Sequence, residues 1–437
     1  MKQQASSNAT TRSFLGVVIG TMIAAIYVVL WVVARPADIR IMSYIGEILG
    51  VEAIVFMSWS LVLATVLPGL EAAFGGLDRQ VIWHRRTALI GATLAFFHQL
   101  LTEPNRSSSP FGATLGSIGF YGLLALIAWA LLSPTSWAAR WGGPLGWVAR
   151  IGYDHWLSIH RLTGVFVVIA MVHGKVADPT LPGSQLLNVT YLAICGVGTA
   201  AYLYRELVMR FILLRAEYHV VKVDRPNART LVVDLEPRAA PLRFVPGQFV
   251  YVDFANNGWH PHPFTIASGL SSPTLQLAIR DSGAETHALY HALQSGSTVR
   301  VGKPHGQFDY HGGGVHQVWV AAGIGITPFI SWIRSLDDAF DHEVDFFYTV
   351  ADEHDALFLK DIQAAAACYP SLRVHLVASG RDGLLTPEQI AKMVPSSLDQ
   401  VWVYMCGPDA MMDSFAQRFR QLGVPRQRIF WEQFAVR

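Results

Sequence analysis

The sequence contains few cysteines and few charged residues. Its three cysteines, Cys195, Cys368 and Cys406, lie far apart among 437 residues. That spacing excludes a disulfide framework and the closely spaced cysteine motifs of zinc and iron–sulfur sites. Charged residues make up only 15% of the chain and the formal net charge is +1, which argues against a nucleic-acid partner. The mean hydropathy of +0.33 points to a membrane protein.

The N-terminus also lacks the pattern of a removable signal peptide. Residues 1–13 precede an apolar run of about 20 residues that has no small-residue cleavage site. We therefore expect a membrane helix that is retained. The chain has no evident internal repeat, and its length predicts two or three domains.

Apolar stretches long enough to cross a bilayer are confined to the first half of the chain. Six occur, at residues 13–34, 44–67, 82–102, 115–133, 158–175 and 186–213. If the N-terminus is cytoplasmic, the only basic residues outside are Arg35, Arg40, Arg106 and Lys175. Basic residues are enriched in cytoplasmic loops, so this orientation is favoured. The sequence thus predicts a multi-pass protein of the inner (plasma) membrane, with residues after 215 in the cytoplasm.

Two of these stretches each carry a pair of histidines. His84 and His98 are fourteen positions apart, and His160 and His173 are thirteen apart. Each pair would span roughly 20 Å along a helix, which fits within a hydrocarbon core of about 30 Å. Neutral imidazole is a common axial ligand of haem iron. We therefore predict two b-type haems, an inner one held by His84 and His160 and an outer one held by His98 and His173.

The spacing of the second pair leaves a geometric question. In an ideal helix thirteen residues leave a rotation of about 220°, which puts His160 and His173 on different faces. Either this helix is locally overwound or underwound, or its histidines approach the haems from different sides. The alternative to haem binding is that the histidines are polar residues packed inside the bundle.

The composition changes from about residue 216. Residues alternate between apolar and polar in several short segments up to about 310, with one helical segment near 284–294, which predicts a small antiparallel barrel. Apolar strands then alternate with helical segments, which predicts a parallel sheet. The predicted domains are residues 1–215, 216–312 and 313–437: a six-helix transmembrane bundle, a β-barrel and an α/β domain.

The predicted barrel contains three motifs. Residues 246–250 form a Pro-Gly-Gln turn that enters a strand, and residues 262–268 read His-Pro-Phe-Thr-Ile-Ala-Ser. Pro263 cannot donate a hydrogen bond to a sheet, which suits a strand with one edge turned to a ligand. Arg280 and Gly283 precede a helix start at Thr286, and helix N-termini favour phosphate groups.

The last domain contains two further motifs. Residues 323–328, Gly-Ile-Gly-Ile-Thr-Pro, follow a buried strand and open a helix, the arrangement in which backbone N–H groups approach a phosphate. Residues 406–408, Cys-Gly-Pro, follow another strand. Ser379 and Arg381 follow the third strand, and their hydroxyl and guanidinium groups suit a phosphate.

Together these motifs resemble the flavin and pyridine-nucleotide modules of the ferredoxin-reductase superfamily. With the histidine helices, the whole chain resembles the NADPH oxidase/ferric reductase family. The resemblance implies FAD and NAD(P)H as cofactors. With such a coenzyme, Ser379 and Arg381 would pair with a 2′-phosphate and favour NADPH over NADH. It places FAD against Gly247, Gln248, His262, Pro263, Phe264, Thr265, Ser268, Arg280, Gly283 and Thr286, and NAD(P)H against Gly323, Gly325, Thr327, Pro328, Cys406, Gly407 and Pro408.

The resemblance also implies roles in hydride transfer for three residues. The Thr265 hydroxyl would lie near the reactive flavin nitrogen, Cys406 near the nicotinamide, and Phe434 over the flavin ring. Phe430 and Trp431 are alternatives to Phe434. The expected activity carries electrons from cytoplasmic NAD(P)H through FAD and two haems to an acceptor outside. We expect oxygen, giving superoxide; the alternatives are a ferric chelate, a periplasmic partner protein, or a reductase whose membrane histidines are only structural.

Overall fold

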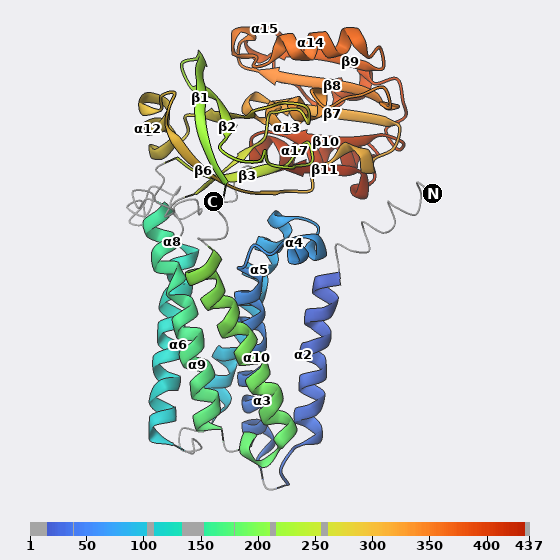
Figure 1. The fold of residues 1–437 in the computed structure, drawn as a ribbon. Helices are drawn as coiled ribbons and strands as arrows, with labels where there is room; N and C mark the ends of the chain where they lie inside the picture. Colours follow the sequence, from blue (N-terminus) through green and yellow to red (C-terminus); the bar gives the residue numbers. More distant parts are fainter. Residues whose placement is uncertain are drawn as a thin grey trace. The chain divides into compact units, whose positions relative to one another are not determined.

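The computed structural model describes residues 15–37, 39–102, 109–132, 153–178, 180–209, 216–254 and 261–432. These residues fall into two compact units (Figure 1). We call them the helical unit, up to Met209, and the C-terminal unit, from Ala216.

The helical unit contains every apolar stretch that the sequence predicted as a helix. Its elements are α2 (Leu15–Val33), α3 (Ile41–Leu63), α4 (Pro68–Phe74), α5 (Leu77–Leu101), α6 (Pro110–Leu131), α8 (Tyr153–Arg161), α9 (Thr163–Ala177), η2 (Leu181–Gly183), α10 (Gln185–Leu203) and the π-helical η3 (Tyr204–Met209). The helix α3 lies along α5 and α10, and α6 lies along α9. Packed apolar side chains between them include the fully buried Trp31 and the nearly buried Tyr27 and Tyr191.

Within the described residues, five helical segments are long and apolar enough to cross a membrane. They are α2, α3, α6, the segment His155–Ala177 and the segment Gln185–Met209. This indicates a multi-pass membrane protein. The remaining predicted span, α5, is a 25-residue helix, but charged residues such as Arg85 and Arg86 give it a lower mean hydropathy.

The structure shows how the helix that carries His160 and His173 is wound. That helix is interrupted at Leu162, where α8 ends and α9 begins. Here the N–H of Leu162 bonds to the carbonyl of Ile159 at 3.1 Å, and the N–H of Val165 bonds to that of Leu162 at 3.0 Å. Bonds between residues three apart wind a helix more tightly than α-helical bonds. The helix is therefore locally overwound at this turn, which brings His160 and His173 part of the way toward a common face.

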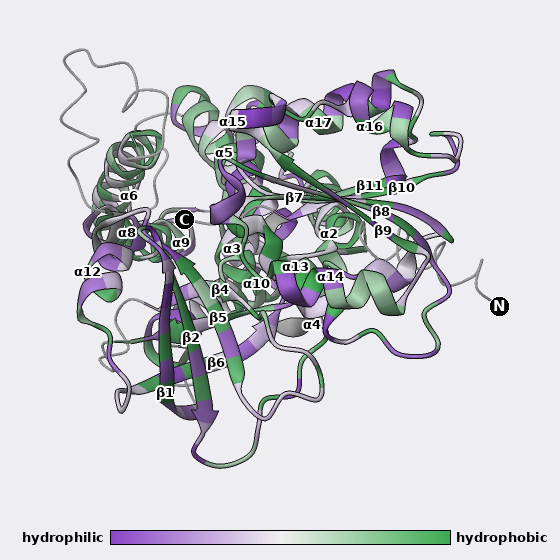
Figure 2. Cartoon of the chain, turned by 90° about the horizontal axis from the view of Figure 1, so that it is seen from above, coloured by the Kyte–Doolittle hydropathy of each residue, from purple (hydrophilic) through white to green (hydrophobic). Residues whose placement is uncertain are grey.

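The first half of the C-terminal unit is an antiparallel sheet. Its strands are β1 (Ala216–Asn227), β2 (Thr230–Pro237), β3 (Phe249–Asp253), β4 (His262–Thr265), β5 (Leu275–Arg280) and β6 (Thr298–His305), in the order β4-β3-β6-β1-β2-β5. A bridge between Ile266 and Leu277 links the two ends of this order. The strands β1 and β2 show alternating hydrophilic and hydrophobic bands (Figure 2). The predicted helix is present as α12 (Ala284–Ala292).

The second half is a parallel sheet of five strands with the order β11-β10-β7-β8-β9. The strands are β7 (His316–Ala322), β8 (Glu343–Val350), β9 (Leu372–Ala378), β10 (Trp402–Cys406) and β11 (Ile429–Glu432). The helical elements between them are η5 (Gly323–Ile326), α13 (Thr327–Ile333), η6 (Glu353–Asp355), α14 (Leu359–Cys368), α15 (Ser379–Asp382), α16 (Pro387–Met393), α17 (Asp409–Gln421) and η7 (Arg426–Arg428). Because the strands are parallel, their carboxyl ends share one edge, where ligands of such sheets bind.

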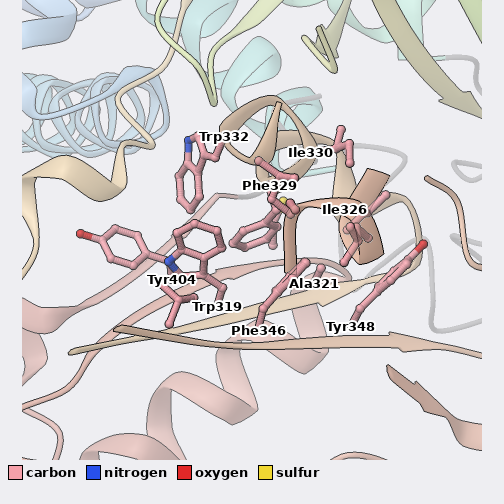
Figure 3. Close-up of a cluster of buried hydrophobic side chains, with 14 of the residues drawn as sticks. Trp319, Ala321, Ile326, Phe329, Ile330, Trp332, Phe346, Tyr348 and Tyr404 are labelled. Carbon is pink, nitrogen blue, oxygen red and sulfur yellow. The ribbon is translucent and has the colours of Figure 1, made fainter. Parts of the chain in front are cut away.

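An aromatic core cluster joins the two sheets. Trp319, Phe329 and Trp332 are fully buried between the parallel sheet and α13 (Figure 3). Phe308, which follows β6, stacks on Trp332 with ring centroids 4.7 Å apart. The indole N–H of Trp332 donates to the carbonyl of Pro246 at 3.0 Å. The cluster therefore fixes the Pro-Gly-Gln turn against the half that contains the parallel sheet.

Candidate functional site

The four histidines of the helical unit come together in two pairs. The ring centroids of His84 and His160 are 6.3 Å apart, and those of His98 and His173 are 6.2 Å apart. Two histidine nitrogens bound to opposite sides of one metal ion, at about 2 Å each, would place their ring centroids about 6 Å apart. Both pairs thus have the separation that a shared metal ion requires.

Hydrogen bonds set the protonation of three of these rings. The Nδ1 atom of His98 lies 2.8 Å from the carbonyl of Gly46, and that of His173 lies 2.8 Å from the carbonyl of Gly112. The Nδ1 atom of His84 lies 2.9 Å from the carbonyl of Ser60. A carbonyl only accepts, so each Nδ1 carries the proton and each Nε2 keeps a free lone pair for a metal. The fourth ring, His160, stacks on Trp156 at 5.3 Å, and its Nδ1 has no partner among the described residues.

Glycines make room for the outer pair, His98 and His173. A Cβ atom at Gly50 would lie 2.6 Å from Nδ1 of His98, and one at Gly116 would lie 2.7 Å from Cε1 of His173. Gly50 lies one turn after Gly46, and Gly116 one turn after Gly112, so each outer histidine lies against two glycines of a neighbouring helix. Our sequence analysis missed these four residues. The sequence contains them as two pairs of glycines four positions apart, and this spacing could have indicated them because it lets membrane helices approach closely.

A cavity of about 340 Å³ adjoins the outer pair. His98, His173, Gly50 and Gly116 line it together with apolar side chains, and Glu47 and Asp178 are also part of its wall. Within the described ranges, no group of three or more His, Cys, Asp or Glu side chains is arranged to hold a bare metal ion. Two histidines that line one mostly apolar cavity instead suit a metal carried in a flat macrocycle.

The flavin motifs of the C-terminal unit meet around two glycines. Gly247 has φ +94° and Gly306 has φ +102°. The side-chain amide of Gln248 donates to the carbonyl of Gly306 at 3.1 Å, which joins the turn to the end of β6. Thr265 is buried at the end of β4, and Pro263 lies in the same strand opposite Tyr251. The strand β4 is at one end of the sheet order, as the proline predicted.

Gly247 is expected to tolerate no side chain, which a matched pair of variants can test. A Cβ at Gly247 would lie 2.1 Å from the carbonyl oxygen of Phe308, whereas no described atom lies within 4 Å of one at Gly296, which has a similar φ of +92°. We expect Gly296→Ala to cost about 1 kcal/mol of unfolding free energy and Gly247→Ala about 4 kcal/mol. Urea unfolding of the full chain, followed by tryptophan fluorescence, measures both. Equal stability of the two variants would contradict this account of the turn.

The phosphate motifs of the two halves also lie together. The Nη1 atom of Arg280, at the end of β5, is 3.2 Å from where a Cβ of Gly323 would be, and Gly323 has φ +56°. A Cβ at Gly325 would lie 2.2 Å from the carbonyl oxygen of Cys406. The glycine loop after β7 is therefore packed between an arginine from one sheet and the end of β10 from the other. Thr327 follows it as the first residue of α13.

Glu432 is a residue of this site whose role our sequence analysis did not identify. It pairs with Cys406 in the register of β10 and β11, and the Cys406 thiol lies 3.8 Å from its carbonyl oxygen. One oxygen of its buried carboxyl group lies 3.3 Å from where a Cβ of Gly306 would be. A carboxyl group thus lies where the flavin and coenzyme motifs meet. Phe434 lies outside the described residues, and the alternative Phe430 stacks on Tyr404 in the core at 5.2 Å.

Two of the residues predicted to contact FAD use their hydroxyl groups for hydrogen bonds within the protein. Ser268 accepts from Gln276 and donates to Thr274, and the Thr286 hydroxyl caps the start of α12. The remaining predicted residues lie at element ends or in β4: His262, which pairs with Glu285, Phe264, Gly283 before α12, Pro328 in α13, Gly407 and Pro408 before α17, and Ser379 and Arg381 in α15.

Comparison with known proteins identifies the C-terminal unit. Residues 216–322 match the family model of an FAD-binding domain, and residues 319–417 match that of an oxidoreductase NAD-binding domain. This unit is an NAD(P)H-dependent flavin oxidoreductase. No family model of a ferric reductase transmembrane domain matches the chain.

Similar proteins are electron-transfer reductases. NADH-cytochrome b5 reductase 1 of Pyricularia oryzae is 31% identical over 148 residues, which cover 31% of this chain and 48% of that protein. The ferredoxin–NAD(P)(+) reductase component of the naphthalene 1,2-dioxygenase system of Pseudomonas putida is 26% identical over 49% of this chain and 67% of its own length. The chain thus spans about half to two thirds of these relatives. A solved structure, the cytochrome P450 reductase GcoB of Amycolatopsis, is 25% identical with a TM-score of 0.45, covering 51% of this chain and 70% of that one.

Proposed function

We propose that this chain is a transmembrane flavocytochrome of the NADPH oxidase/ferric reductase type. It carries electrons from NAD(P)H to an acceptor on the opposite face of the membrane. The observation that carries the proposal is the pairing of four histidines in two sets, with centroids 6.2 and 6.3 Å apart and three Nδ1 atoms bound to carbonyls. Bound FAD and two b-type haems would supply hydride acceptance and one-electron transfer.

The helical unit would hold the haems through its histidines. His84 and His160 would bind the inner haem, and His98 and His173 the outer one. The carbonyls of Ser60, Gly46 and Gly112 would keep Nε2 of three of these residues unprotonated and so able to bind iron. The apolar helices around them exclude water and so favour haem over a bare ion.

We propose that α5 is a sixth membrane span. It carries two of the four histidines and lies along α3, one of the five apolar segments. The charged residues Arg79, Arg85 and Arg86 cluster in its first half, where they would meet the cytoplasmic lipid headgroups. The N-terminus and the C-terminal unit would then be cytoplasmic, in the inner (plasma) membrane.

The C-terminal unit would position the coenzyme against the flavin. Backbone N–H groups of the loop at Gly323 and Gly325 would hold the pyrophosphate of the coenzyme. The guanidinium of Arg280, which lies beside this loop, would hold that of FAD. Thr265, Cys406 and Phe434 would border the reacting rings, with Thr265 donating a hydrogen bond to the flavin and Phe434 covering it. The Glu432 carboxyl would lie next to them.

We propose oxygen as the outer acceptor, with superoxide as the product. The cavity beside His98 and His173 has the carboxyl groups of Glu47 and Asp178 in its wall. Carboxylates disfavour anionic ligands such as most ferric chelates, whereas oxygen is neutral and small.

The test is optical and uses the purified full chain in lipid nanodiscs. We expect two haems per FAD, and haem bands that appear when NADH or NADPH is added without oxygen. Admitting air should reoxidise the haems quickly and form superoxide, while ferric citrate should act slowly. A preparation with full FAD content but no haem bands would refute the proposal, and fast reoxidation by ferric citrate alone would reassign the acceptor.

A further inference from the structure

Two neighbouring loops lie at the edge of the parallel sheet that would bind the coenzyme. The strand β8 lies next to β7, which leads into the Gly323 loop, and β9 lies next to β8. Residues 351–355 follow β8, and α15 (Ser379–Asp382) follows β9 directly. In sheets of this kind the pyrophosphate lies on the helix after the first strand, and the adenosine ribose lies over the following strand ends. These two loops would therefore face the 2′ position of that ribose.

Arg381, the residue expected to recognise a 2′-phosphate, is bound by two carboxylates. Its Nε and Nη2 atoms donate to the two oxygens of Asp382 at 2.8 and 3.0 Å, and its Nη1 donates to Glu353 at 3.0 Å. A bidentate arginine–carboxylate pair is among the stronger polar contacts in proteins. The guanidinium is thus engaged on both sides by the chain itself.

The backbone holds these groups in place. The N–H of Ala378 donates to Asp382 at 3.0 Å, and the N–H of Gly380 donates to the carbonyl of Ala351 at 3.0 Å, which ties the loop after β8 to α15. Hydrogen bonds from Arg381 and then from Ala378 lower the pKa of the Asp382 carboxyl. It is therefore ionised at neutral pH.

The local charge is negative. The two loops contain Asp352, Glu353, Asp355 and Asp382 against the single arginine Arg381, and α15 is coloured hydrophilic in Figure 2. A phosphate monoester brings a charge of about −1.5 to −2 at pH 7. It would meet an excess of carboxylates, whereas a ribose 2′-hydroxyl would donate a hydrogen bond to one of them.

We propose that this carboxylate clamp makes the chain select NADH against NADPH, with Glu353 and Asp382 as the residues that determine specificity. The inference rests on the proposed hydride transfer from a nicotinamide coenzyme. It reverses the expectation from the sequence, in which Ser379 and Arg381 favoured NADPH.

The test compares both coenzymes on the full chain with FAD bound. Anaerobic stopped-flow reduction of the flavin should give a kcat/KM for NADH about 10-fold or more above that for NADPH. The double variant E353Q/D382N keeps the size of both side chains and removes both negative charges, which weakens their hold on the guanidinium of Arg381. We expect its kcat/KM for NADPH to rise about 10-fold and that for NADH to fall.

A control and a binding measurement complete the test. Glu388→Gln removes a carboxylate from another exposed arginine pair, with Arg418, and should leave the coenzyme ratio unchanged. Calorimetry with AMP and 2′-phospho-AMP needs no hydride transfer, so it separates failed recognition from failed chemistry. Wild-type protein that prefers NADPH and 2′-phospho-AMP, or a ratio that the double variant does not move, would overturn the clamp. Preferential binding of AMP without flavin reduction would leave the clamp standing and overturn the reductase mechanism.

Discussion

Replacing His98 with alanine is expected to remove the outer haem and stop electron flow across the membrane. The His98 ring lies 6.2 Å from that of His173, so its loss would leave the outer site with one of its two proposed ligands. We expect the haem-to-flavin ratio to fall from two to one, and electron transfer to the outer acceptor to fall about 100-fold or more. Haem content is measured by pyridine haemochrome absorbance, and electron flow by superoxide formation.

The same experiment includes two checks on the interpretation. Reduction of ferricyanide at the flavin should be unchanged, because the C-terminal unit is a separate compact unit. His155→Ala serves as the control, since His155 is exposed on α8 and belongs to neither pair. If His98→Ala kept both haems and full superoxide formation, the ligand assignment would be wrong.

The positions of the helices and the pairing of the histidines could be predicted from sequence. The winding of the helix between His160 and His173 could not. Apolar runs mark the six predicted stretches because both the lipid and the protein core favour apolar side chains. The overwound turn at Leu162 contains no proline. It has a local bond, from the Thr163 hydroxyl to the carbonyl of His160 at 2.6 Å, and a tertiary contact at Gly164, where a Cβ would lie 2.3 Å from the Tyr202 ring. Because a helical threonine also occurs in regular turns, the sequence alone left the winding open.

The features of the C-terminal unit that the sequence did not predict have a similar origin. The strand β11 has four residues, too few for a recognisable alternation, and it forms because β10 offers an edge. The position of Glu432 follows from that pairing. Arg381 resembles a phosphate ligand in the sequence, but it is bound by its neighbour Asp382 and by Glu353, which lies 28 positions earlier in the loop after β8. Motif reading finds the backbone turns well because glycine positions are local requirements, whereas the contact with Glu353 exists only in the folded chain.

The glycines beside the outer histidines provide the second large expected effect. A Cβ introduced by Gly50→Ala would overlap the His98 ring at 2.6 Å from Nδ1, and one introduced by Gly116→Ala would overlap the His173 ring at 2.7 Å. We expect either ring to tilt away, which would break its Nδ1 bond to Gly46 or Gly112 and turn Nε2 from the proposed haem iron. Loss of such a supporting contact lowers metal affinity about 10- to 100-fold.

We therefore expect Gly50→Ala and Gly116→Ala each to lose much of the outer haem while the inner haem stays bound. Haem spectra recorded during dilution of the purified variants measure the loss. Gly196→Ala is the matched control, because it lies in the α10 membrane helix and no described atom lies within 4 Å of its added Cβ. Alanine there should keep both haems and, by helix propensity, stabilise the helix by up to about 1 kcal/mol. Since haem binding should depend on these glycines only if the histidines are true ligands, wild-type spectra in both bundle variants would count against the whole arrangement.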